Sequence, residues 1–194
     1  MRESVENLLD EAAEWCRGKN WLARLPLLVY FVYVLFRQLA DPVYTSVLGG
    51  INLGIHELGH LVFMPLGQTM GVAGGTILQL AIPVFAIFNF YRQKEFFGMA
   101  LSFGWISTNL FYIATYLADA RRLELPMVTP FGGDNVIHDW EYLLSEMNVL
   151  QYDTAIATGI RGVAVVTMLV CFTAGAWLLW KMAVNKNLVD KTVK

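Results

Sequence analysis

The segment His56-Glu57-Leu58-Gly59-His60 carries the side chains with the clearest capacity for chemistry. Histidines four positions apart lie on the same face of an α-helix, because four residues make slightly more than one turn. Two imidazoles on one face can bind a single Zn²⁺, and a glutamate between them can take a proton from water as a general base. The spacing therefore predicts one zinc ion bound by His56 and His60, with Glu57 as the catalytic residue.

A third zinc ligand is expected from elsewhere in the chain, since catalytic zinc usually has three protein ligands and one open position. The sequence contains three histidines, and the third, His138, is the predicted ligand. Three carboxylates of the same polar segment are the alternatives, as ligands or as groups that orient a ligand. They are Asp119, Asp134 and Asp139.

The surroundings of Glu57 strengthen the prediction of a metal. Between Pro42 and Tyr91, Glu57 is the single residue with a formal charge. An ionised carboxylate inside a bilayer costs at least ~2.5 kcal/mol, so such groups are usually paired or functional. No lysine or arginine of this stretch can neutralise Glu57, whereas a bound cation would.

The same region resembles the site-2 protease family of intramembrane zinc metalloproteases. The resemblance rests on His56-Glu57-Leu58-Gly59-His60, followed by Gly74-Gly75-Thr76-Ile77-Leu78-Gln79 and Pro83, and it covers residues 42–91. It implies zinc binding by the two histidines, activation of water by the glutamate, and contacts of Gly75 and Gln79 with the substrate backbone. The two glycines also suit a tight turn that enters the next helix.

The sequence departs from that family at the third ligand. The family uses an aspartate in a Leu-Asp-Gly type motif, which is absent here. The downstream segment His138-Asp139-Trp140 is similar to a divergent branch of bacterial membrane proteins of this type. This resemblance implies a location in a bacterial cell membrane.

The composition indicates that the elements positioning these residues are membrane helices. Of 194 residues, 56% are apolar and 15% are charged, whereas soluble domains average roughly 45–50% and about 25%. The formal net charge of −2 provides no basic surface for a nucleic acid, which excludes that partner. The expected partners are the lipid bilayer and a membrane-protein or peptide substrate, and the oligomeric state stays open.

Five segments are apolar enough to supply the ~20 residues that a helix needs to cross a bilayer. They are residues 22–39, 43–64, 73–91, 96–117 and 162–180. We therefore expect an all-α, polytopic transmembrane bundle with a single membrane domain over residues 21–183. An amphipathic helix is predicted within residues 1–20, and a polar tail covers residues 184–194.

Five spans would place the long polar loop, residues 119–151, on the same side of the membrane as the N-terminus. The spacing of its apolar residues predicts an amphipathic helix from Val136 to Leu150, capped by Asp134 or Asn135. The same five spans put 7 of the 14 lysines and arginines on each side, so the distribution of positive charge predicts no orientation.

These features together predict an intramembrane zinc metalloprotease. Two other functions use the same residues. A membrane zinc hydrolase of lipid amides or esters needs the same metal and base, with a groove for an acyl chain. A non-catalytic scaffold or pseudoprotease would instead bind zinc with four protein ligands and no water.

Overall fold

The computed structural model describes residues 2–126 and 137–192, and over these ranges the chain is helical and contains no strand. The predicted all-α class is therefore confirmed. The α-helices are α1 (Arg2–Trp15), α2 (Leu25–Ala40), α3 (Gly49–Phe63), α4 (Gln68–Arg92), α5 (Phe96–Ala118), α6 (Asp139–Glu146) and α7 (Asp153–Thr192). Two short 3₁₀ helices, Met64–Leu66 and Leu150–Tyr152, follow α3 and precede α7.

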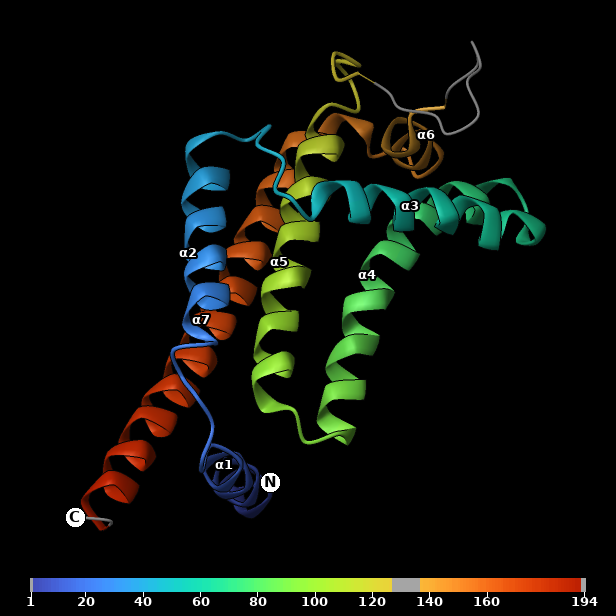
Figure 1. Cartoon of the computed structure of the whole chain (residues 1–194). Helices are drawn as coiled ribbons and strands as arrows, with labels where there is room; N and C mark the ends of the chain where they lie inside the picture. Colours follow the sequence, from blue (N-terminus) through green and yellow to red (C-terminus); the bar gives the residue numbers. More distant parts are fainter. Residues whose placement is uncertain (1, 127–136, 193–194) are drawn as a thin grey trace.

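Three helical segments of the described chain are long and apolar enough to cross a membrane: Gln68–Arg92, Phe96–Ala118 and Leu150–Asn185. They contain the predicted spans 73–91, 96–117 and 162–180. Helices α4 and α5 lie side by side, joined by a short turn, and α5 packs along α7 (Figure 1). These segments indicate a membrane protein.

The two other predicted spans are shorter than expected. Helix α2 has 16 residues and α3 has 15, so they are about 24 and about 22 Å long, less than a hydrocarbon core of roughly 30 Å. Helix α2 runs along α7, but α3 lies crosswise over one end of the bundle (Figure 1). The structure therefore corrects the span predicted over 43–64, because residues 41–48 form turns and the helix begins only at Gly49.

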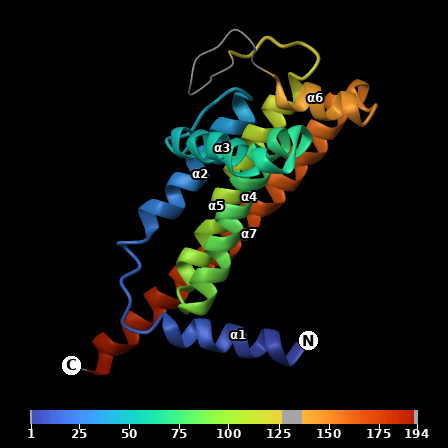
Figure 2. The ribbon, with the colours of Figure 1, turned by 90° about the vertical axis from the view of Figure 1, so that its right-hand side faces the viewer.

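The crosswise position of α3 changes the arrangement of the two ends. Helix α1 and the end of α7 lie at one end of the bundle, whereas α3 and α6 lie at the other (Figure 2). The described parts of the loop, residues 119–126 and 137–151, therefore lie at the end opposite to α1, in contrast to the sequence prediction. The reason is that α2, α4, α5 and α7 run along the bundle and α3 does not.

The bundle is packed around α5 and α7. The Ser107 hydroxyl donates a hydrogen bond of 2.7 Å to the Ala164 carbonyl, which joins the two helices where both are buried. Helix α2 approaches them at glycines, since Phe31 lies against Gly104 and Leu28 against Gly175. Small residues at helix contacts allow the close approach that packing in a membrane requires.

Helix α1 is the amphipathic helix predicted at the N-terminus. Its buried face includes Ala12 and is continued by Cys16, whose thiol contacts the Leu178 carbonyl of α7 at 3.6 Å. An ion pair between Glu11 and Lys94 ties it to the turn between α4 and α5. This helix closes the end of the bundle that lies away from α3.

Helices α3 and α4 meet through glycine backbone. The chain reverses at Gly67, whose φ of +100° is accessible mainly to glycine, and returns along α3. A Cβ atom added at Gly59 would lie 2.2 Å from the Gly74 carbonyl oxygen, so the two backbones are in direct contact. Gly74 therefore lies inside α4 and forms a helix contact rather than a turn.

This contact predicts the effect of an added methyl group. Gly59→Ala is expected to force α3 away from α4 and to lower the midpoint of thermal unfolding in detergent. Gly54→Ala is the matched control on the same helix, because a Cβ atom there would have nothing within 4 Å and alanine is the better helix former. Equal thermal midpoints for the two variants would contradict the close contact.

Candidate metal centre

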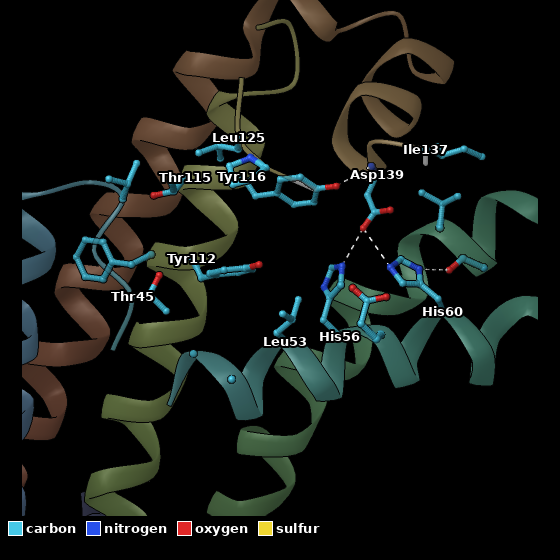
Figure 3. A pocket seen from close by; sticks show the side chains of 18 of the residues that line it. Thr45, Leu53, His56, His60, Tyr112, Thr115, Tyr116, Leu125, Ile137 and Asp139 are labelled. Carbon is cyan, nitrogen blue, oxygen red and sulfur yellow. Dashed lines mark hydrogen bonds and ion pairs between the residues drawn. The ribbon is translucent and has the colours of Figure 1, made fainter. Parts of the chain in front are cut away.

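The two histidines of α3 meet one carboxylate of α6. The Asp139 Oδ2 atom lies 2.9 Å from His56 Nε2 and 3.3 Å from His60 Nε2 (Figure 3). His56 and Asp139 are buried, with 4% and 6% of their surface exposed. Residues 83 positions apart in the sequence thus converge on one point at the crosswise end of the bundle.

The separations are comparable to those of ligand atoms around one metal ion. Bonds of ~2.0–2.2 Å in a tetrahedral zinc site place the ligand atoms about 3.3–3.6 Å apart. The two distances from Asp139 Oδ2 to the histidine Nε2 atoms, 2.9 and 3.3 Å, are within a few tenths of an ångström of that spacing. The contacts of Asp139 with both histidines are therefore compatible with one shared metal ion.

The second nitrogen of each imidazole is already hydrogen bonded. The His56 Nδ1 atom lies 3.0 Å from Gln79 Oε1, and the His60 Nδ1 atom lies 2.9 Å from the Gly71 carbonyl oxygen. Both partners are acceptors, so both Nδ1 atoms carry a proton and donate it. The Nε2 atoms are thereby left with their lone pairs directed at Asp139, as is typical of histidines that bind metal.

The orientation of the Gln79 amide is fixed by its neighbours. Its Nε2 group donates to Asn109 Oδ1 at 2.9 Å, and the Asn109 Nδ2 group donates to the Trp105 carbonyl at 3.1 Å. Rotating either amide would place donor against donor or acceptor against acceptor. The chain from α5 through Gln79 to His56 therefore has a single consistent direction, and it fixes the tautomer of His56.

Each imidazole consequently faces acceptors on both sides. A neutral imidazole has one N–H group, so its second nitrogen presents a lone pair to the Asp139 carboxylate. That contact is repulsive unless each ring gains a proton or one cation lies between the three atoms. A single metal ion satisfies both rings and the carboxylate at once.

The charge of Asp139 suits such a role. Burial raises the pKa of Asp139, but the contacts with His56 and His60 outweigh burial when the two rings carry positive charge, and they then hold the pKa below its usual value. Asp139 is therefore ionised at neutral pH. A buried carboxylate without a cation nearby is strongly unfavourable.

Glu57 completes the group that could hold or serve a metal ion. Ligand atoms of His56, Glu57 and His60 lie within 4.8 Å of one another, so these three residues could also hold a metal ion. Glu57 is half-buried and lines the cavity described below. Its carboxylate has no hydrogen-bond or ion-pair partner among the described residues, so it is available as a base.

A cavity of about 1030 Å³ leads to the metal centre. It follows α3 from Gly49 to the histidines and is bounded by residues 42–45 and by α5 (Figure 3). Most of the lining is apolar, and the described part of it contains no lysine or arginine. The histidines, Glu57 and Asp139 all border this space, so a substrate in it can reach them.

The predicted ligand His138 is not at the metal centre. Its Nδ1 atom accepts a hydrogen bond from the Glu141 backbone at 3.2 Å and thereby caps α6, so the cap expected at Asp134 or Asn135 lies at His138 instead. Its Nε2 atom lies 3.8 Å from Asp119. Burial lowers the pKa of His138, and the nearby Asp119 only partly opposes this effect, so the ring is neutral.

The other candidates have different positions. The Asp119 carboxylate accepts hydrogen bonds from the backbone amides of Glu124 and Leu125, which shapes the loop after α5. Asp134 lies outside the described residues. Asp139, an alternative at the sequence level, is the residue that reaches both histidines, because α6 begins at 139 and not at 136.

The two predicted substrate contacts, Gly75 and Gln79, lie behind the imidazoles. A Cβ atom at Gly75 would be 2.7 Å from the His56 ring and 2.8 Å from the His60 ring, so the absence of a side chain makes room for both. Gln79 is fully buried, and its amide is used by His56 and Asn109. Both residues support the histidines and neither borders the cavity.

The interpretation of this centre depends on its own geometry. Comparison of the chain with protein-family models, with curated proteins and with solved structures finds no match. The residues themselves therefore carry the assignment of the metal centre. The sequence and the geometry differ most on the third metal ligand, because the sequence favours His138 and the geometry favours Asp139.

Two variants distinguish these ligands. Asp139→Ala removes the third ligand atom, and we expect the purified protein to lose its metal. His138→Asn keeps an acceptor that can cap α6, so this variant is expected to keep the metal. Elemental analysis of protein purified without chelators measures both. Loss of the metal from His138→Asn and its retention in Asp139→Ala would reverse the assignment.

Proposed function

We propose that this chain is a zinc-dependent hydrolase that cleaves peptide bonds of membrane-protein substrates within the membrane of a bacterial cell. One observation carries the proposal. His56 and His60 use their N–H groups at Nδ1 and direct their Nε2 atoms at the shared Asp139 carboxylate. Glu57, which has no partner among the described residues, lies beside them and borders a cavity large enough for a substrate. The resemblance to site-2 proteases supports the same reaction.

Zinc is the ion that best suits these ligands. Two histidines and one carboxylate form a common catalytic zinc set, and imidazole favours zinc over magnesium or calcium. When bound, zinc supplies a Lewis acid that polarises a carbonyl group and makes water acidic at neutral pH. Gln79 and Gly71 hold the imidazole tautomers that such an ion requires.

The residues of the chain account for the movement of protons. Glu57 takes a proton from the water while the oxygen of the water bonds to the carbonyl carbon of the substrate. The carbon–nitrogen bond then breaks, and its electron pair stays on nitrogen. Glu57 returns the proton to that nitrogen, so the amine leaves neutral and the base is restored.

The arrangement bears differently on the two other functions predicted from the sequence. A structural zinc site needs four protein ligands, and beside the histidines and Asp139 the remaining candidate among the described residues is Glu57, which we assign to the base. A lipid hydrolase requires the same centre and differs only in its substrate. We assign peptides on the resemblance, and the lipid is an arm of the test below.

We further propose that the chain is multi-pass, with both termini in the cytoplasm. Helices α2, α4, α5 and α7 run along the bundle, and the end that holds α1 also holds the turn between α4 and α5 and the later part of α7. The positive residues of these segments with described side chains are Arg17, Lys19, Arg24, Arg92, Lys94 and Lys181. The end with α3 and α6 holds Arg37, Arg121, Arg122 and Arg161. Cytoplasmic segments carry the excess of lysine and arginine. The metal centre would then lie near the opposite face of the membrane.

The proposed reaction predicts the effect of Glu57→Gln. The variant keeps the size and polarity of the side chain but cannot take a proton, so cleavage is expected to fall by about 10²–10⁴-fold with unchanged zinc content. The measurement uses zinc-loaded protein in vesicles and a panel of helical membrane peptides.

Ceramide-like lipids form the second arm of that experiment. Cleavage of lipids alone, lost in Glu57→Gln, would keep the hydrolase and replace the peptide substrate. Activity of Glu57→Gln equal to that of the wild type would remove Glu57 from the reaction. Activity that persists in Asp139→Ala without zinc would overturn the metal-dependent function.

The orientation is testable by labelling single cysteines in whole cells. Cys16 and Cys171 are replaced by alanine, and Glu14→Cys or Glu124→Cys then places one exposed thiol at either end of the bundle. A reagent that does not cross membranes is expected to label Glu124→Cys in intact cells, and Glu14→Cys only after lysis. The reverse pattern would place both termini outside the cytoplasm.

A further inference from the structure

We propose that Tyr112 is a second catalytic residue, whose hydroxyl donates a hydrogen bond to the carbonyl oxygen of the scissile bond. The inference rests on the proposed hydrolase function and adds a residue that the sequence motif does not contain. It follows from the face of α5 that borders the cavity, from the hydrogen bonds already made on that face, and from the charge that hydrolysis creates.

Helix α5 presents two tyrosines to the metal centre. Tyr112 and Tyr116 are four residues apart, so they lie on the same face of the helix, and both line the cavity (Figure 3). The Tyr116 ring lies 6.4 Å from the His56 ring, and its hydroxyl accepts the Asp139 backbone N–H at 3.3 Å. One turn away, the Tyr112 hydroxyl points across the cavity toward His56 (Figure 3).

The hydroxyls of this face differ in whether they already make a hydrogen bond. The Tyr116 hydroxyl is occupied by the first residue of α6, and the Thr115 hydroxyl donates to the Pro42 carbonyl at 2.6 Å. The Tyr112 hydroxyl has no hydrogen-bond partner within the described parts of the chain. It lines the same cavity as Glu57 and Asp139.

The reaction requires a donor at this place. As the water oxygen bonds to the carbonyl carbon, the electron pair of the carbonyl double bond moves to its oxygen, which becomes negative. A donor aimed at that oxygen stabilises the transition state, and removal of one such donor typically costs about 10²–10³-fold in rate. Tyr112 keeps its proton throughout, because Glu57 carries the proton from the water to the leaving amine.

Among the side chains of α5 that border the cavity, Tyr112 is the donor left available. The cavity lining contains no lysine or arginine in the described residues, and the amides of Gln79 and Asn109 are used in the support of His56. Tyr112 alone combines a free O–H group with a position facing the centre from α5.

The test is Tyr112→Phe, which removes one oxygen atom and leaves the ring. We expect kcat on the peptide substrate to fall by about 10²-fold, with KM within threefold and with full zinc content. The affinity of the zinc-loaded variant for a phosphinic peptide, which mimics the tetrahedral geometry, is expected to weaken by a similar factor in calorimetry. Binding of uncleaved peptide in a Glu57→Gln background should not change.

The matched control is Tyr152→Phe, which removes an exposed hydroxyl outside the cavity and should leave all five quantities unchanged. If Tyr112→Phe keeps kcat and the phosphinic-peptide affinity within twofold, the role of Tyr112 is overturned, while loss of cleavage in Glu57→Gln still supports the hydrolase. If kcat and KM change together with zinc content, Tyr112 is structural and the proposal also fails. A wild type without zinc-dependent cleavage overturns both proposals.

Discussion

The site depends on one constraint, which is that a neutral imidazole has a single N–H group to donate. His56 and His60 use that group on Gln79 and on the Gly71 carbonyl, so the shared Asp139 carboxylate meets two lone pairs. A cation between the three atoms removes the conflict. The hydrogen bonds of the Gln79 and Asn109 amides fix this direction of hydrogen bonding, and they connect α5 in the bundle with the candidate metal centre.

The constraint also explains the packing around α3. The imidazoles can lie against α4 only because Gly75 leaves space behind them, and the two helices approach that closely through Gly59 and Gly74. A crosswise helix over the end of a bundle exposes one side to a cavity and the other to its neighbour. Glu57 therefore borders open space while its flanking histidines are held from behind. Rigid ligands and an accessible base result from the same geometry.

The sequence predicted the local part of this centre and not its long-range part. His56, Glu57 and His60 are separated by less than two helical turns, so their arrangement follows from helix periodicity alone. The choice between His138 and Asp139 depended on where α6 begins, because neighbouring residues of a helix point about 100° apart. Hydropathy predicted a span over residues 43–64 because it measures apolar content and contains no information on the direction of a helix relative to the bundle. Gln79 was found by resemblance, and its burial, visible only in the fold, changes its role from substrate contact to support of His56.

The candidate metal ligands come from α3 and α6, which are separated in the chain by α4 and α5 and meet at the Asp139 carboxylate. A cation bound by His56 and Asp139 would join positions 83 residues apart and close a long loop through the bundle. Closing so long a loop removes much of the conformational freedom of the unfolded chain. The ion would therefore hold the short helix α6 against the bundle. Binding of the ion would complete the proposed catalytic site and fix the position of α6 at the same time.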